Sequence, residues 1–81
     1  MMQEPKIEAN YDEEHDIMYI DVGEPEPSYA DGVEPGVHVR RGMFDERITG
    51  AIIEGYSKKS KKHLASILPK IFSKYLISSV V

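Results

Sequence analysis

The sequence predicts an α+β fold, a small antiparallel β-meander of about four strands with a C-terminal helix packed on one face. Three observations lead to this class. The chain has 81 residues, which is room for one domain spanning residues 1–81. Apolar and polar residues alternate within residues 7–57, as in strands, whereas apolar residues recur every three or four positions within residues 58–77, as in a helix. Most connections are also too short for the crossovers that parallel strands need.

Two strands joined by a polar turn are expected at the start of the domain. Residues 6–11 alternate, with Ile7, Ala9 and Tyr11 on one side and polar side chains on the other. Residues 12–15 are all polar and short enough for a hairpin turn. Because the segment that follows, DIMYIDV, is rich in β-branched and aromatic residues, it is the clearest strand of the chain.

Residues 23–36 contain three prolines and three glycines. Proline cannot donate a hydrogen bond to a neighbouring strand, so we expect a long loop here, with at most a short edge piece near residues 28–31. Alternation resumes at residues 37–41, where valines face one way and His38 and Arg40 the other. A turn at residues 42–47 leads to a last strand at residues 48–55.

An apolar stripe predicts the C-terminal helix, and Ser57 or Ser60 is expected to cap its start. Pro69 lies within the stripe, where proline removes a backbone hydrogen bond at a cost of about 3 kcal/mol. Either the helix kinks there, or one helix ends near Leu68 and Pro69 opens a second. Since the stripe is continuous, we expect both halves on the same sheet face, and we expect residues 78–81 to fray. The stripe comprises Leu64, Ile67, Leu68, Ile71, Phe72 and Tyr75.

Two of the expected strands are apolar on both sides, which bears on oligomeric state. One helix cannot cover both faces of such a sheet, so the uncovered apolar face favours a homodimer. In the second strand Ile17 and Tyr19 oppose Met18, Ile20 and Val22, and in the last strand Ile48 and Ile52 oppose Ala51 and Ile53.

The segment YDEEHDIMYI at residues 11–20 resembles the opening of the YuzE-like family, small prokaryotic proteins with a YD-x-x-x-D-x-L-Y-I pattern. Residues 36–39 and 48–53, closed by Ser57, are similar to the later strands of that family. The resemblance covers residues 7–57. It implies a compact sheet with a helix and the role of a companion to small toxin-type proteins, but it implies no reaction. Two departures are Met18 in place of leucine and Ile52 in place of a glutamate.

The charge is divided unevenly along the chain. Residues 1–56 hold all 14 acidic residues and four basic ones, a net charge of −10, whereas residues 57–81 hold six lysines and no acid. A solvated or intramolecular role for these lysines is the simplest interpretation, and a partner or nucleic-acid surface is the alternative. The candidate surface comprises Arg40, Arg41, Lys58, Lys59, Lys61 and Lys62.

No constellation in the sequence predicts catalysis, a metal or a cofactor. The chain has no cysteine, and the polar run at residues 12–16 lacks the glycine and the spacing of a calcium loop. His15, His38 and His63 could in principle assemble a zinc site, because spacing does not show folded proximity, but we expect them to be solvated. Glu54 lies in an apolar strand, but an edge-facing charge explains it as well. We therefore expect a cytoplasmic protein without a signal peptide or membrane span, which is not an enzyme. A protein–protein interaction module, with a co-encoded partner or as an antitoxin-like companion, is the leading hypothesis; nucleic-acid binding and a small metal-dependent enzyme are the alternatives.

Overall fold

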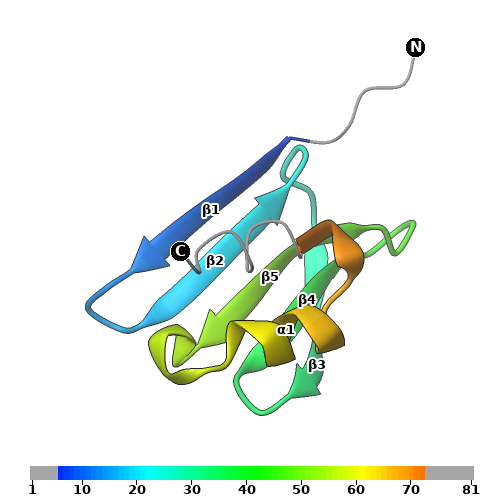
Figure 1. Ribbon diagram of the computed structural model, residues 1–81. Coiled ribbons are helices and arrows are strands. Elements are labelled where there is room, and N and C mark those ends of the chain that lie inside the picture. Colours follow the sequence, from blue (N-terminus) through cyan, green and yellow to red (C-terminus); the bar gives the residue numbers. More distant parts are fainter. Residues whose placement is uncertain (1–5, 73–81) are drawn as a thin grey trace.

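Five antiparallel strands form a single sheet in the order β1-β2-β5-β4-β3 (Figure 1). The computed structural model describes residues 6–72. The α+β class and the antiparallel sheet are confirmed, with five strands instead of about four. The strands are β1 (Ile7–Asp12), β2 (Ile17–Val22), β3 (Ser28–Glu34), β4 (Val37–Gly42) and β5 (Ile48–Glu54).

The order of the strands departs from a simple meander at one place. β1 and β2 form a hairpin and β3, β4 and β5 form a meander, but β2 pairs with β5 and not with β3. The connection at residues 23–27 therefore passes from β2, the second strand of the sheet, to β3 at its far edge. This arrangement puts β5 at the centre of the sheet, with a hydrogen-bonded neighbour on each side.

β3 lies where a loop with a short edge piece was expected. Pro27 and Pro35 flank this strand without interrupting it, and β3 is an edge strand that pairs only with β4. Its pairing is irregular, because the register shifts between Gly32 and Glu34. The prolines excluded a central strand, as predicted, but they permitted an edge strand seven residues long.

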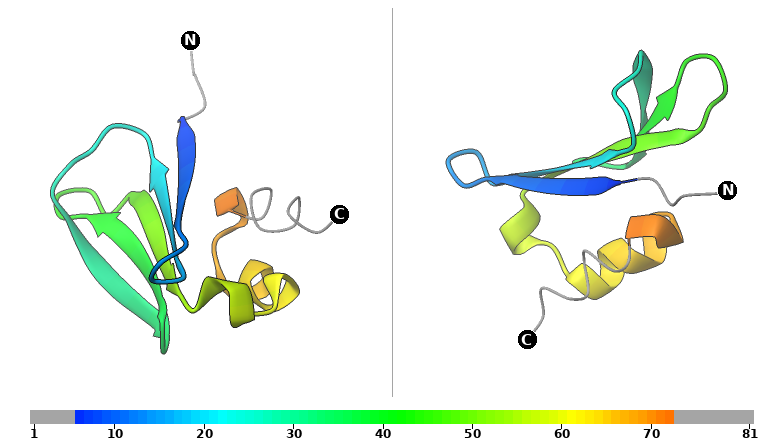
Figure 2. Two further views of the ribbon diagram at one scale, coloured as in Figure 1. Left: turned by 90° about the vertical axis from the view of Figure 1, so that its left-hand side faces the viewer. Right: turned by 90° about the horizontal axis from the view of Figure 1, so that it is seen from above.

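The helical layer consists of η1 (Tyr56–Lys58), α1 (Lys61–Ile67) and η2 (Lys70–Phe72). Ser60 caps α1 by accepting a hydrogen bond from the His63 backbone N–H at 3.1 Å. α1 ends at Leu68, and Pro69 precedes η2, so the helix is broken at the proline. Both halves lie on the same side of the sheet (Figure 2). Tyr75 and the tail at residues 78–81 lie outside the described residues.

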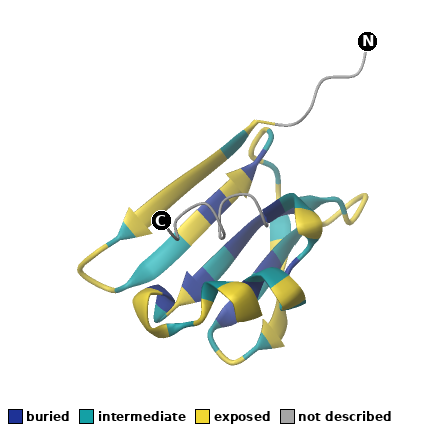
Figure 3. Ribbon diagram, viewed as in Figure 1, coloured by how far each residue is buried: buried dark blue, intermediate teal, exposed yellow. Residues whose placement is uncertain are grey.

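The core lies between the sheet and this helical layer. Burial is concentrated on the central strands, while β1 is mostly exposed (Figure 3). Leu64, Leu68 and Phe72 recur at the spacing of a helix and are all buried although the helix breaks between them. The largest fully buried side chains are Phe72, Ile20, Ile53, Leu64 and Val37.

Ile48 was expected on the same side of the last strand as Ile52, and this expectation is wrong. The pairing of β4 with β5 shifts register between Arg40 and Arg41, so that Arg40 pairs with Gly50 and Arg41 with Ile48. Such a bulge interrupts the alternation of side chains. As a result Ile48 packs against the core while Ile52 stays on the open side.

Candidate functional site

The sheet face opposite the helical layer, here called the open face, carries a row of residues that includes an ion pair. Gly50 pairs with Asp21 on one side and with Arg40 on the other. Because Gly50 has no side chain, the Arg40 guanidinium reaches over it, with Nη1 lying 3.7 Å from Asp21 Oδ1. This row of the open face is thus charged and internally paired.

The next row holds the apolar residues of the open face. Tyr19 and His38 both pair with Ile52, and Ile17 lies beside Glu54. Tyr19 is 38% exposed, and His38 Nε2 lies 3.3 Å from Glu54 Oε2. The open face is therefore a short apolar strip bordered by the Arg40–Asp21 ion pair and the His38–Glu54 contact, and it is less apolar than expected from the sequence.

A cleft of about 670 Å³ opens at one end of the open face, beside the connection from β2 to β3. Both cations of its lining lie beside a carboxylate: Lys6 Nζ lies 3.2 Å from Glu8 Oε1, and Arg40 is paired with Asp21. The cleft is lined by Lys6, Glu8, Asp21, Gly23, Glu24, Pro25, Glu26, Ser28, Arg40 and Thr49. With four carboxylates and two cations, the lining of the cleft is acidic overall.

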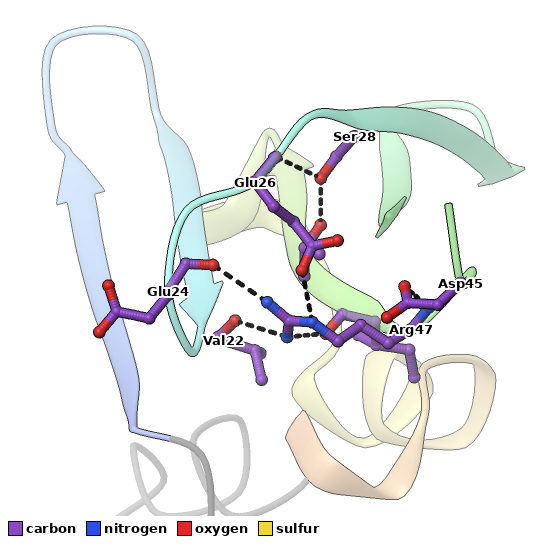
Figure 4. Close-up of polar contacts among 8 residues, drawn as sticks. Val22, Glu24, Glu26, Ser28, Asp45 and Arg47 are labelled. Carbon is purple, nitrogen blue, oxygen red and sulfur yellow. Dashed lines mark hydrogen bonds and ion pairs between the residues drawn. The ribbon is translucent and has the colours of Figure 1, made fainter. Parts of the chain in front are cut away.

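Arg47 makes hydrogen bonds to the segment between β2 and β3 that lines this cleft (Figure 4). Its Nε donates to Glu26 Oε2 at 2.6 Å, its Nη2 to the Glu24 carbonyl oxygen at 3.0 Å, and its Nη1 to the Val22 carbonyl oxygen at 3.2 Å. Charge-assisted hydrogen bonds of this kind are stronger than neutral ones. Arg47 therefore holds the β2–β3 connection against the β4–β5 turn.

The β4–β5 turn, residues 43–47, carries the most exposed apolar side chains among the described residues. Phe44 is 86% exposed and Met43 is 61% exposed. The backbone of the turn is ordered by hydrogen bonds from Met43 N–H to the Pro27 carbonyl at 3.0 Å and from Glu46 N–H to the Gly42 carbonyl at 3.0 Å. This site was not predicted from the sequence, although Met43 and Phe44 form an apolar pair inside a polar turn.

The basic residues singled out from the sequence do not form one continuous strip. Arg40 lies on the open face, and its neighbour Arg41 faces the other way, with Nε 3.7 Å from Asp31 Oδ2. Lys61 lies 4.0 Å from the centre of the Tyr56 ring and donates to the Tyr56 carbonyl at 2.9 Å. The remaining lysines of the candidate surface, in and beside η1 and α1, are Lys58, Lys59 and Lys62.

Three residues of the YuzE-like pattern meet at the end of the first hairpin. The Asp16 carboxylate accepts hydrogen bonds from the Tyr11 hydroxyl at 2.5 Å, the Ser57 N–H at 2.9 Å and the Ser57 hydroxyl at 2.8 Å. These bonds hold the pKa of Asp16 below its usual value, with the Tyr11 hydroxyl as the largest cause. Asp16 thus ties the β1–β2 turn to η1, which is a structural role.

Each histidine lies beside a carboxylate, and each pair is on a different part of the fold. His15 Nδ1 lies 2.8 Å from Asp12 Oδ2 in the first turn, and His63 Nε2 lies 2.9 Å from Glu34 Oε1. Within residues 6–72, no group of three or more His, Cys, Asp or Glu side chains is placed to hold a metal ion. The histidines therefore serve as partners of single carboxylates.

Comparison with family models, with curated proteins and with solved structures gave no match for this chain. The YuzE-like resemblance therefore stays a prediction. In the part of the chain that the structure describes, no helix has the length and apolar character needed to cross a membrane.

Proposed function

We propose that this chain is a non-catalytic protein-interaction module that docks on a partner protein through the β4–β5 turn. The observation that carries the proposal is the 86% exposure of Phe44 on a turn that Arg47 and backbone hydrogen bonds brace. A large aromatic side chain gains little from full exposure to water, whereas buried aromatic anchors dominate the energetics of protein interfaces. The partner is proposed to be a co-encoded protein, of which this chain is an antitoxin-like companion.

The surroundings of Phe44 indicate the chemistry of the partner. Asp45 and Glu46 follow Phe44 directly, and both are exposed. A matching surface would therefore offer an apolar pocket for Phe44 and Met43 with basic residues on its rim. Because the turn is already ordered by its hydrogen bonds, docking would cost little conformational entropy.

The test is the affinity for the protein encoded by the neighbouring gene, measured by isothermal titration calorimetry with wild-type chain and variants. Phe44→Ala is expected to weaken binding by about 30-fold or more, as for an anchor residue, while Phe44→Leu retains part of the affinity. Tyr19→Ala, which truncates an aromatic residue on the open face, is the matched control and is expected to bind as the wild type does. Absence of binding by the wild type, or equal binding by Phe44→Ala, would overturn the proposal.

Nucleic-acid binding is the second candidate and has weaker support. Lys58 and Lys62 are exposed and available for phosphate contacts. However, Lys61 is occupied by Tyr56, and both Arg40 and Arg41 lie near carboxylates. The cations that such a surface needs are thus dispersed over the fold instead of being aligned.

A further inference from the structure

The two edges of the sheet are built differently, and the difference bears on self-association. The β3 edge has an irregular register between Gly32 and Glu34 and is flanked by Pro27 and Pro35, features that discourage pairing with another strand. The β1 edge has six consecutive regular pairs with β2 and contains no proline, glycine or bulge. The β1 edge is therefore the one that remains open to another strand.

The outward-facing backbone groups of β1 follow from its pairing with β2. The Lys6 carbonyl accepts a hydrogen bond from the Gly23 N–H at 2.7 Å, so the backbone of Lys6 faces β2. Because successive residues of a strand direct these groups to opposite sides, the N–H and C=O groups of Ile7, Ala9 and Tyr11 face the free edge. These groups are the template that an added antiparallel strand would use.

Residues equally far from Ala9 on its two sides are complementary, so that two antiparallel copies of β1 centred on Ala9 would place complementary side chains opposite one another. If a second β1 pairs antiparallel with Ala9 opposite Ala9, then Lys6 lies opposite Asp12 and Ile7 lies opposite Tyr11. Both matches are favourable cross-strand pairs, one of opposite charges and one of aliphatic with aromatic. Each of these cross-strand pairs occurs twice in a symmetric dimer. Since residues opposite one another point to the same face, the helical layers of both copies lie on the same side of the joined sheet.

The neighbouring registers that keep both helical layers on one side are unfavourable. Centring the pair on Glu8 puts Glu8 opposite Glu8, and centring it on Asn10 puts Glu8 opposite Asp12 twice. Like charges directly opposite one another are destabilising. Charge thus selects the register centred on Ala9.

We propose that two copies of this chain associate through their β1 edges, antiparallel and centred on Ala9, to form one continuous ten-stranded sheet. The proposal differs from the dimer expected from the sequence, which used the uncovered sheet face. It is independent of the proposed function, because β2 separates β1 from β5 and the β4–β5 turn stays free.

A cysteine scan tests both the interface and its register, since the chain has no cysteine of its own. In the proposed pair the two Ala9 Cα atoms are about 5.5 Å apart, within the range that a disulfide spans. The two Glu8 Cα atoms would be offset by two residues, about 8 Å apart and beyond that range. Ala9→Cys is therefore expected to give a covalent dimer under mild oxidation, and Glu8→Cys is expected to stay monomeric on a non-reducing gel.

Charge reversal supplies a second test, by sedimentation equilibrium against the monomer mass of 9.2 kDa. Wild type is expected to dimerise, and Lys6→Asp, which places two pairs of like charges in the interface, is expected to raise the dimer Kd at least tenfold. Lys62→Asp makes the same charge change on α1 and is expected to leave the Kd unchanged. A monomeric wild type, or cross-linking by Glu8→Cys in preference to Ala9→Cys, would overturn the proposal. A dimer that Tyr19→Lys abolishes and Lys6→Asp does not would assign association to the open face and overturn it equally.

Discussion

The two faces of the sheet are formed by the same strands, but one face is buried and apolar and the other is exposed and partly charged. On the covered face, Ile20, Val37 and Ile53 are at most 1% exposed and pack against the helical layer. On the open face, Tyr19, which precedes Ile20, is 38% exposed, and Asp21, which follows Ile20, lies beside Arg40. Since alternate side chains point to opposite faces, each strand contributes its stability on one side and its solvated groups on the other. Changes on the covered face should therefore affect stability far more than equivalent changes on the open face.

The largest effect is expected at Phe72, which lies in η2 and is fully buried in the core between the helical layer and the covered face. Phe72→Ala removes a large side chain and leaves a cavity, so the free energy of unfolding should fall by about 3–5 kcal/mol. A domain of this length has a total stability of about 4–12 kcal/mol, so the variant should be close to unfolded at 37 °C. Urea unfolding monitored by circular dichroism measures the loss.

Phe44→Ala is the matched control for this prediction, because it makes the same substitution at a side chain that is 86% exposed. Its free energy of unfolding should stay within about 0.5 kcal/mol of the wild type. Equal losses from the two substitutions would contradict the assignment of the core to the covered face.

An intermediate effect is expected at Gly50, where the open face comes close to the backbone of β2. A Cβ atom at this position would clash with the Ile20 carbonyl oxygen, a backbone atom of the neighbouring strand. Gly50→Ala should therefore lower the free energy of unfolding by about 1–3 kcal/mol, the usual range for overpacking. Chemical denaturation gives the value.

Gly32→Ala on β3 controls for the loss of a glycine in a strand. The nearest atom to a Cβ at Gly32 is His38 Nδ1 at 3.9 Å, an ordinary contact distance. This variant should be neutral or slightly stabilised, since alanine restricts the unfolded chain. If Gly32→Ala were as destabilised as Gly50→Ala, the loss could not be attributed to the close approach of β2.

Much of the fold could be predicted because it depends on local patterns. The β-branched and aromatic residues around Ile20 predicted β2, and the alternation around Val39 predicted β4. The helical stripe with Pro69 predicted a helix that is kinked or broken near the proline and lies on one face of the sheet. Pairing over long distances was harder to foresee. The adjacency of β2 and β5 and the bulge that turns Ile48 inward depend on contacts between strands, which no single segment encodes.

The candidate site was missed for the same reason. Arg47 looks like one of several surface cations in the sequence, and its role depends on carbonyls of Val22 and Glu24 that the fold brings to it. Arg40 and Arg41 are neighbours in the sequence and were expected to share one surface, whereas in the structure they face opposite ways and lie beside separate carboxylates. Charge counts predict the polarity of a segment but not which charges remain free.

The smallest effect is expected for the ion pair on the open face. Arg40 and Asp21 are 38% and 54% exposed, and their closest atoms are 3.7 Å apart, so water and salt weaken their attraction. A double-mutant cycle with Arg40→Ala and Asp21→Ala should give a coupling free energy of about 0–1 kcal/mol in urea unfolding, decreasing further in 1 M salt. A coupling above about 2 kcal/mol that salt does not reduce is typical of a desolvated pair. Such a value would mean that the open face is covered in solution. The difference in burial between the two faces would then hold only for the isolated chain.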